Sequence, residues 1–193
     1  NHYYRAHGEG IYCNYSHIHD NYVYTRDNDS YYNGGWPGHA IINNGNNADN
    51  LSITENNTII ADYYVRGFEG NYAIVRNNTF KGIDEETGVT ANHEWAIMGG
   101  NYNEITGNTI IGFRDGIHID NDWDVIIEDN YIESRYWGVY ANNANGEHII
   151  RNNEFVKYTT DGEWFVYATN MDNIIIEDNT FVGSGGNGFY INN

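Results

Sequence analysis

The stretch from Val125 to Ile132, written VIIEDNYI, decides the fold, because variants of it recur along the chain. Each copy has a short strand-like segment, an anchor asparagine and an apolar residue two positions later. The seven anchors are Asn21, Asn57, Asn78, Asn108, Asn130, Asn153 and Asn179. Successive anchors are 36, 21, 30, 22, 23 and 26 residues apart, which is the repeat length of a solenoid.

Two more short strands accompany each copy. The first alternates apolar and polar residues and reads GIYCN, HAIIN, YYVRG, EWAIMG, GIHID, GVYAN, WFVYAT and GFYIN. In GIHID, Ile117 and Ile119 should face the interior, while His118 and Asp120 face outward. The other strand begins after the anchor asparagine. The sequence therefore predicts an all-β coil of about seven to eight turns, with residues 1–193 as one domain. Because the chain begins with Asn1 and not Met, we expect a portion or a processed form of a longer chain.

The recurrence of asparagine at the anchor positions can be explained by the hydrogen bonds that a sharp corner requires. A sharp corner between strands turns backbone groups inward, and an unsatisfied buried polar group costs about 1–3 kcal/mol. An asparagine side chain has both a donor and an acceptor, so asparagines stacked about 4.8 Å apart can bond to the corner and to each other. Asparagine also tolerates left-handed backbone geometry. The second copy is out of step, because its Leu51/Ile53 alternation does not match Asn57, and a bulge or altered corner is expected there.

The phrase I-x-x-N-N-T-I followed by G-I-x-I resembles the repeat of right-handed parallel β-helix proteins of the pectate-lyase-like superfamily. The resemblance extends from about Gly10 to Asn193 and implies three short parallel sheets with an internal asparagine ladder. The superfamily includes polysaccharide lyases, glycoside hydrolases, epimerases, tailspikes and adhesins, so the resemblance specifies the fold more than the function. It also implies a groove on the outer face of the first-strand sheet.

Two outward columns are predicted on that face. Alignment on Ile117 gives Tyr12, Ile41, Arg66, Met98, His118, Tyr140, Tyr167 and Tyr190 for one column, and Asn14, Asn43, Asp120, Asn142, Thr169 and Asn192 for the other. Aromatic rings and amides suit a sugar chain. Tyr12, Tyr140, Tyr167 and Tyr190 are therefore candidate glycan-binding residues, together with Trp36 as a sugar platform in the loop from Tyr24 to Gly38. A second long loop runs from Lys81 to Glu94. Trp95, Trp137 and Trp164 align in what we expect to be an inward column.

Two reaction types are consistent with these residues. A lyase could use Arg66 as base or charge neutraliser and His118 as base, with calcium held by Asp120, Asp122 and Asp124. A solvated acidic corner is the other interpretation of that run. A glycosidase needs two nearby carboxyl groups, for which the sequence offers Asp62 with Glu94, or Asp115 with Asp120. The diagnostic motifs of polygalacturonases and alginate epimerases are absent, so enzyme status stays open.

Two further candidates are weaker. His17 and His19 alternate on one strand face and, with Asp20, suggest zinc, but ordinary outward polar residues are the favoured interpretation. Cys13, the single cysteine, aligns with inward Ile119 and is expected to be a small buried hydrophobe.

Charge and composition limit the partners. The chain has 27 acidic and 9 basic residues, and its formal charge of −18 disfavours nucleic acid and anionic membranes. No apolar run is long enough to span a membrane. The start at Asn1 and sequons at Asn14, Asn50, Asn56 and Asn77 favour an extracellular or surface location. We therefore predict a carbohydrate-binding or polysaccharide-degrading protein. The alternative is a structural or adhesive protein that associates end to end, because no capping helix is evident.

Overall fold

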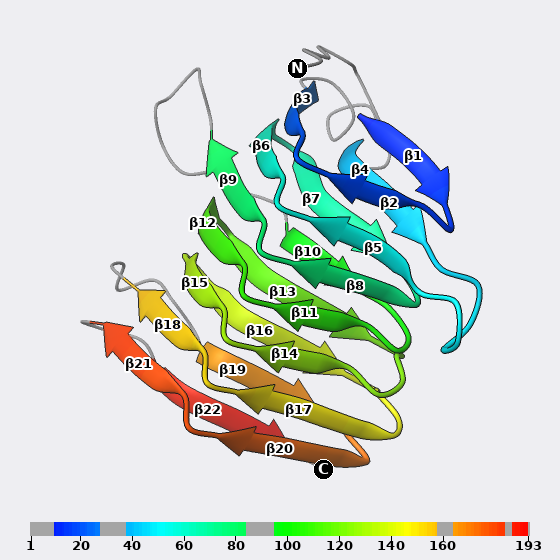
Figure 1. Cartoon of the computed structure of the whole chain (residues 1–193). Coiled ribbons are helices and arrows are strands. Elements are labelled where there is room, and N and C mark those ends of the chain that lie inside the picture. Colours follow the sequence, from blue (N-terminus) through cyan, green and yellow to red (C-terminus); the bar gives the residue numbers. More distant parts are fainter. Residues whose placement is uncertain (1–9, 28–37, 84–94, 158–163, 184–186, 193) are drawn as a thin grey trace.

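The computed structural model describes residues 10–27, 38–83, 95–157, 164–183 and 187–192. These residues contain 22 strands and no helix, and the strands form three parallel sheets. The coil runs from β1 near the top of Figure 1 to β20 and β22 at the bottom. The three-sheet parallel β-helix expected from the sequence is therefore confirmed. No helix in this part of the chain is long and apolar enough to cross a membrane.

Each sheet takes one strand from every turn. Sheet A contains β1 (Ile11–Asn14), β4 (Gly38–Asn44), β7 (Val65–Gly70), β10 (Trp95–Gly99), β13 (Asp115–Asp120), β16 (Trp137–Asn142), β19 (Trp164–Thr169) and β22 (Asn187–Asn192). Sheet B contains β2 (His17–His19), β5 (Ser52–Glu55), β8 (Ala73–Arg76), β11 (Glu104–Thr106), β14 (Ile126–Glu128), β17 (Glu147–Arg151) and β20 (Asn173–Glu177). Sheet C contains β3 (Tyr22–Asp27), β6 (Thr58–Tyr63), β9 (Thr79–Ile83), β12 (Thr109–Phe113), β15 (Tyr131–Ser134), β18 (Glu154–Lys157) and β21 (Thr180–Gly183).

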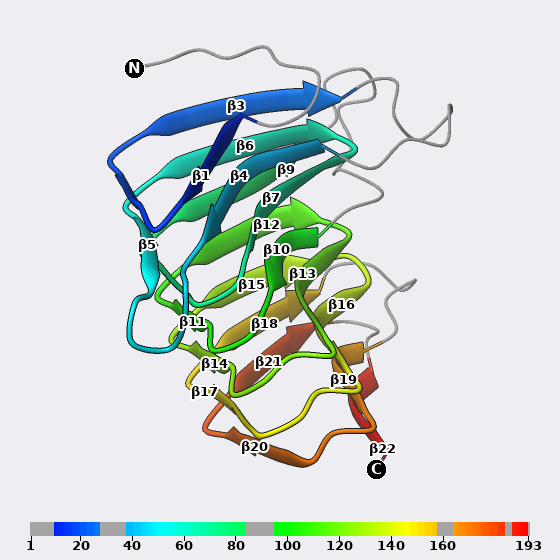
Figure 2. The ribbon, with the colours of Figure 1, turned by 90° about the vertical axis from the view of Figure 1, so that its right-hand side faces the viewer.

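The sheets enclose one elongated core (Figure 2). Its buried apolar side chains form a single cluster that extends from Ile18 to Met171. Equivalent residues of successive turns lie directly over one another, as in the stacked rings of Phe155 and Phe181, whose centres are 5.2 Å apart. Burial of apolar surface between neighbouring turns is thus the main source of stability, as in other solenoids.

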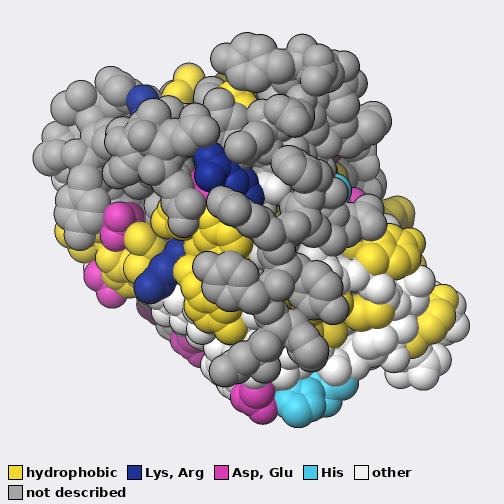
Figure 3. Space-filling model, turned by 90° about the horizontal axis from the view of Figure 1, so that it is seen from above, with side chains coloured by type: hydrophobic (Ala, Val, Ile, Leu, Met, Phe, Trp, Pro, Cys, Tyr) yellow, Lys and Arg dark blue, Asp and Glu magenta, His cyan; other side chains and the backbone are white. Residues whose placement is uncertain are grey.

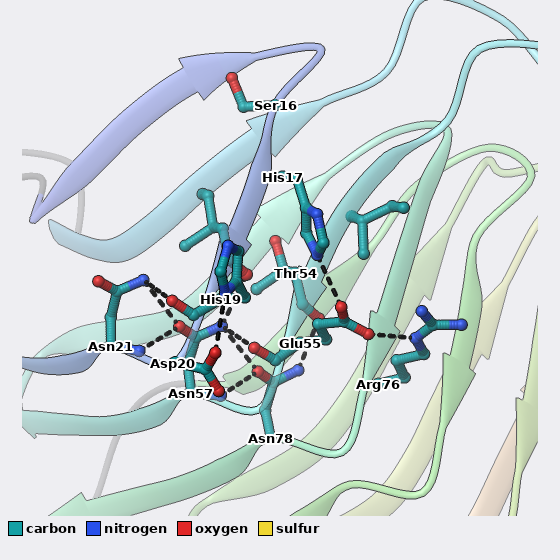
Figure 4. Close-up of polar contacts among 12 residues, drawn as sticks. Ser16, His17, His19, Asp20, Asn21, Thr54, Glu55, Asn57, Arg76 and Asn78 are labelled. Atoms are coloured by element: carbon teal, nitrogen blue, oxygen red, sulfur yellow. Dashed lines mark hydrogen bonds and ion pairs between the residues drawn. The ribbon is translucent and has the colours of Figure 1, made fainter.

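The predicted asparagine ladder is present at the corner between sheets B and C. The backbone N–H of Asn108 donates to Asn130 Oδ1 at 2.9 Å, and its side-chain Nδ2 donates to the same oxygen at 3.0 Å. The same pair of bonds joins every anchor from Asn21 to Asn179 to the next. Figure 4 shows its first steps. Each amide therefore satisfies corner groups that would otherwise be buried without partners.

Left-handed backbone geometry belongs to the residue before each anchor, and the anchors themselves do not adopt it. Those preceding residues have φ between 52° and 63°, and they are Asp20, Asn56, Asn77, Gly107, Asp129, Asn152 and Asp178. Only aspartate, asparagine and glycine occur there, which are the residues that tolerate this region best. Each corner consists of one such residue and one anchor.

The second copy contains no altered corner, so that expectation is wrong. Asn57 makes the same ladder bonds as the other anchors, and β5 pairs with β8 in regular register. Instead, Ser52 and Thr54 take the inward positions and are buried. They are satisfied by buried Asn43, which donates to Thr54 Oγ1 at 3.1 Å and whose carbonyl accepts from Ser52 Oγ at 3.0 Å. A local polar network, and not a bulge, accommodates the shifted pattern.

Removal of one ladder amide should destabilise the coil. Asn130→Ala removes the acceptor of the Asn108 bonds and is expected to lower the free energy of unfolding by about 1–3 kcal/mol. Asn173→Ala, at an exposed strand position of the same sheet-B edge, is the control and should be nearly neutral. Equilibrium chemical denaturation measures both. Equal losses for the two variants would contradict the structural role of the ladder.

Candidate functional site

The predicted column lies on the outer face of sheet A, but Ile42 and Glu69 occupy the positions predicted for Ile41 and Arg66. The strand register aligns Met98, His118, Tyr140, Tyr167 and Tyr190 as expected. At the other end, Tyr12 pairs with Ile42, and Glu69 pairs with both Ile42 and Met98. Ile41 is instead fully buried, opposite Ile11 and Phe68. Arg66 lies three residues before Glu69 on β7. Because Ile41 and Ile42 are adjacent in β4, the sequence did not show which of the two side chains faces outward.

Aromatic side chains of this face form one continuous stack. Its consecutive centre-to-centre distances are 3.9 Å for Trp95–His118, 4.7 Å for His118–Tyr140, 5.4 Å for Tyr140–Tyr167 and 4.9 Å for Tyr167–Tyr190. The guanidinium of Arg66 extends the stack, 4.3 Å from the centre of the Trp95 ring. Because the rings are within about 20° of parallel, their faces are covered by neighbours and their edges face outward. Most of these rings are therefore unsuited to stacking on a sugar.

The tryptophans belong to this outer layer, so their predicted inward position is wrong. Trp137 pairs with Trp164 in register, but its ring contacts those of Tyr140 and Tyr167, at 4.7 and 6.1 Å. Trp164 likewise contacts Tyr190. The inward positions beside them are taken by smaller residues, such as Gly138 and Ala96, both of which are buried.

His118 and Arg66, two of the four predicted catalytic residues, are held within the stack. Burial lowers the pKa of His118 to about 4, and the charges of Arg66 and Arg114 add to this shift. Among the described residues, His118 Nδ1 has no hydrogen-bond partner. Arg66 Nη1 contacts Glu69 Oε2 at 3.0 Å, His39 Nε2 at 3.3 Å and Met98 Sδ at 3.3 Å. His118 is therefore a neutral imidazole, and the guanidinium of Arg66 is paired with Glu69.

The two predicted carboxylates lie in different environments. Asp115 is fully buried, where Oδ1 accepts from the backbone N–H of Trp137 at 3.3 Å and Oδ2 lies 3.7 Å from Arg114 Nε. Asp120 is partly exposed and accepts from Asn142 Nδ2 at 3.2 Å. Asn142 Oδ1 in turn accepts from Thr169 Oγ1 at 2.8 Å, so the second outward column is a hydrogen-bonded row. Asn43 does not belong to this column, because it is buried and Asn44 takes its place opposite Asn14.

The predicted calcium run does not converge on one point, and calcium is not supported. Asp122 is buried and its Oδ2 accepts from the backbone N–H of Asp120 at 3.2 Å. Asp124 Oδ1 accepts from the backbone N–H of Glu147 at 2.7 Å. Across the described segments, no three histidine, cysteine, aspartate or glutamate side chains are grouped to hold a metal. These carboxylates instead cap backbone donors at the corner between sheets A and B.

The same corner contains a pocket that the sequence analysis missed. It has a volume of about 330 Å³ and is lined by Tyr72, Asn101, Tyr102, Asn121 and Trp123. The rings of Tyr72 and Tyr102 are stacked with centres 5.4 Å apart, and Trp123 is 48% exposed. The lining combines aromatic surface with side-chain amides and contains no ionisable acid or base other than the tyrosines. Such a lining suits a neutral polar ligand with apolar faces.

Backbone conformation marks this corner as unusual. Tyr72 has φ 52° and Tyr102 has φ 55°. Tyr15, two turns before Tyr72, also lies in the left-handed region, with φ 52°. Equivalent corners elsewhere use Asn143 and Asn170. A bulky residue in left-handed geometry is strained, and such strain is concentrated at functional sites. Recurrent tyrosines after the end of a sheet-A strand were the available sequence signal, but only the structure shows their geometry.

Two predicted residues lie outside the described part of the chain. Trp36, the proposed sugar platform, and Glu94, the proposed partner of Asp62, belong to segments 28–37 and 84–94. Asp62 itself is buried and accepts from the hydroxyl of Tyr24 at 2.9 Å. Tyr12 is exposed at the N-terminal end of its column.

The acidity of Asp122 gives a pH-dependent prediction. Burial raises the pKa of Asp122 to about 7, and the nearby Asp120 carboxylate adds to the rise. The neutral form thus favours folding below the unfolded pKa of about 4, and this contribution is lost as the pH rises through 7. Asp122→Asn cannot ionise and should raise the free energy of unfolding at pH 8 by about 1 kcal/mol or more, with little effect near pH 4. Thermal unfolding across this range measures the difference. Asp129→Asn, at an exposed corner, is the control. If the change in the free energy of unfolding caused by Asp122→Asn is the same at every pH, the raised pKa of Asp122 is contradicted.

Comparison with known proteins identifies one family. The model of the family described as periplasmic copper-binding protein (NosD) matches residues 49–193, well over half of the chain. No curated protein and no solved structure matches the chain. The family description refers to the periplasm, which is compatible only at a coarse level with the predicted extracellular or surface location. By this match, and with the parallel β-helix that its sequence builds, the chain belongs to the NosD family of periplasmic proteins.

Proposed function

We propose that this protein is a periplasmic or extracellular β-helix that binds a neutral glycan. The observation that carries the proposal is the corner pocket lined by Tyr72, Tyr102, Trp123 and two asparagines. A pyranose ring has apolar C–H faces and equatorial hydroxyls, which match an exposed indole and neighbouring amides. The volume of about 330 Å³ is at the small end of ligand pockets, so one or two sugar units are the expected occupants.

Charge supports a neutral sugar over a uronic acid. The chain has a formal charge of −18, and Asp120 and Asp124 belong to the turn that carries Trp123. An anionic polymer would approach this surface against electrostatic repulsion unless a cation bridged it. A neutral glycan has no such barrier. The formal charge of −18 therefore supports a neutral sugar as the ligand.

Binding, rather than cleavage, is the activity we propose. A lyase or glycosidase needs a base or a pair of carboxyl groups that can reach the substrate. Asp115 is enclosed, and His118 lies between the rings of Trp95 and Tyr140. The edges of Tyr140, Tyr167 and Tyr190 and the Asp120–Asn142–Thr169 row could extend the glycan contact along sheet A through their hydroxyl and amide groups. That extended surface supports binding of a chain and supplies no obvious cleavage step.

Loss of the indole should weaken glycan binding. Trp123→Ala removes the exposed aromatic surface of the pocket and is expected to lower affinity for a bound neutral oligosaccharide by about 10-fold or more. A glycan array identifies the ligand and titration calorimetry measures the affinity. Tyr22→Ala, an exposed aromatic of sheet C, is the matched control. Reducing-end assays on the same glycans test for cleavage.

Three outcomes have different meanings. Binding that survives Trp123→Ala but is lost in the Tyr140→Phe, Tyr167→Phe double variant would move the site to sheet A. The release of reducing ends would replace binding with hydrolysis. If no glycan binds, the proposal is overturned.

Copper, which the family description names, does not fit the histidines and methionine that the structure describes on and beside sheet A in the matched segment. His148 already uses both ring nitrogens, with Nδ1 accepting from the backbone N–H of Val125 and Nε2 bonded to the carbonyl of Asn145. His118 is enclosed between two rings, and Met98 Sδ accepts from Arg66. These imidazole and thioether groups lie in separate places, and each is hydrogen-bonded or enclosed by aromatic rings. We therefore assign copper no part in the proposed function.

A second candidate function is end-to-end assembly, favoured by the last described turn. Phe189 and Ile191 lie in the inward columns opposite Val166 and Ala168, yet they are 47% and 49% exposed. The ladder also has direction, because each anchor N–H donates to the following turn. The Asn179 end of one copy would then meet the Asn21 end of another in the direction of the ladder, so the occupant we propose is a second copy in the same orientation.

Sedimentation tests this assembly. The chain should form concentration-dependent oligomers that Phe189→Asp abolishes, because a charge would then face the partner's core. Val182→Asp, which places a charge at an exposed position of sheet C, is the control. A strict monomer at all concentrations would overturn the assembly and leave the glycan proposal unaffected.

A further inference from the structure

A column of isoleucines runs along the outer face of sheet B. Its members are partly exposed, whereas the alternate residues of the same strands are buried or packed against the core. The strand register places in this column, from the first turn to the last, His17, Ile53, Ile74, Glu104, Ile126, Ile149 and Ile175. The strands of sheet B run down the front of the coil in Figure 1, and no described element lies over them. Sheet B therefore presents an apolar stripe that no described part of the chain covers.

The next outward column is a row of charges of both signs. From the first turn to the last it consists of His19, Glu55, Arg76, Thr106, Glu128, Arg151 and Glu177. Neighbours within it are paired, with 2.6 Å between Arg76 Nε and Glu55 Oε2 and 2.9 Å between Arg151 Nη2 and Glu128 Oε2. Figure 4 shows the start of the row, and Figure 3 shows histidine and acidic side chains together at one rim of the molecule. The side chains of Arg76 and Arg151 are 43% and 40% exposed, so each can make a further contact.

The order of these charges changes sign about its centre. Thr106 is the middle member of the row. Counted outward from it, Arg76 on one side corresponds to Glu128 on the other, and Glu55 corresponds to Arg151. If a second copy of the row is turned end for end and laid against the first, each of these acids faces a base. The row is thus complementary to a reversed copy of itself.

We propose that sheet B is the interface of a dimer in which a second copy of this chain packs face to face with its coil reversed. The two-fold axis then runs parallel to the strands and through the middle turn, so the interface is the same patch on both copies. Across it, Ile53 meets Ile149 of the second copy, and Ile74 meets Ile126. Burial of these side chains drives the association, and the charged rows determine its orientation.

The other two-fold arrangement of the same faces lacks this complementarity. With the axis along the coil, each charged row would meet the opposite edge of the second copy's sheet B. That edge, two residues before the isoleucine column, carries Leu51, Tyr72, Tyr102, Asp124, Glu147 and Asn173. It contains no basic residue, so Glu55 and Glu128 would face no cation across the interface. Complementary charge therefore favours the reversed arrangement.

The size and charge of the face predict a weak dimer. Seven strands about 4.8 Å apart, each of about four residues with a rise of about 3.3 Å, give a face of about 400 Å² per copy. A standard interface buries about 800 Å² per partner. The formal charge of −18 on each copy adds repulsion, and the exposed Glu104 of one copy meets that of the other near the axis. The dimer should therefore form at high protein concentration.

Sedimentation of the Phe189→Asp chain tests the face, because this substitution removes the end-to-end assembly proposed above. A monomer–dimer equilibrium is expected. Adding Ile126→Asp should weaken dimerisation by about 10-fold or more, because it buries a carboxylate against Ile74 of the second copy. Ile111→Asp, at a partly exposed position of sheet C, is the matched control and should have little effect. A monomer at every concentration, or equal weakening by the two substitutions, would overturn the proposal.

Mixing two charge variants tests the orientation, again in the Phe189→Asp chain. Arg76→Glu and Glu128→Arg should each weaken self-association, because like charges would face one another at two equivalent contacts. An equimolar mixture should restore dimerisation, because every such contact then joins an acid to a base. Sedimentation with one variant fluorescently labelled measures the mixed dimer. Long-range repulsion alone would instead favour self-association of the Glu128→Arg chain, which is the less negative of the two. A mixture that dimerises no better than the separate variants would overturn the reversed arrangement.

Discussion

The hydrogen-bonded contact between stacked asparagines at the corner of sheets B and C is the constraint on which the whole structure depends. Each anchor amide after Asn21 accepts from the backbone and side chain of the previous anchor, and the middle anchors are almost fully buried. Without these bonds, seven sharp corners would bury unpaired backbone groups. With them, every turn is held in the same rotational position, so residues distant in sequence form straight columns.

Regular stacking also decides where function can lie. On sheet A it presses aromatic rings against one another and hides the faces that a sugar would need. At the corner between sheets A and B the turns differ in length and backbone conformation, and there Tyr72, Tyr102 and Trp123 leave an open pocket. The regular sheets are thus the scaffold, while the departures from regularity are where we propose that recognition takes place, as is usual for loops on rigid folds.

The sequence predicted the features that depend on periodic chemistry. The anchors were identifiable because an asparagine that recurs with the same neighbours indicates hydrogen bonding at a repeated corner. The column from Met98 to Tyr190 followed from the strict alternation of apolar and polar residues. Consecutive apolar residues such as Ile41 and Ile42 did not show which side chain faces outward, so the prediction of Ile41 for the outer column was wrong. The corner pocket depends on backbone angles at Tyr72 and Tyr102, which no residue pattern specifies. The carboxylates of Asp120, Asp122 and Asp124 were close in sequence, but their hydrogen bonds turn them toward different backbone groups.

The uniformity of the ladder corners bears on how such a coil can change in length. Every corner has the same two-residue form and offers the same bonds to the turn on either side. Excision of the chain from one anchor to the next would therefore join two ends that already fit, whereas loss of a few residues within a strand would not. A coil of this kind could therefore gain or lose a whole turn while every remaining corner kept its form and its bonds.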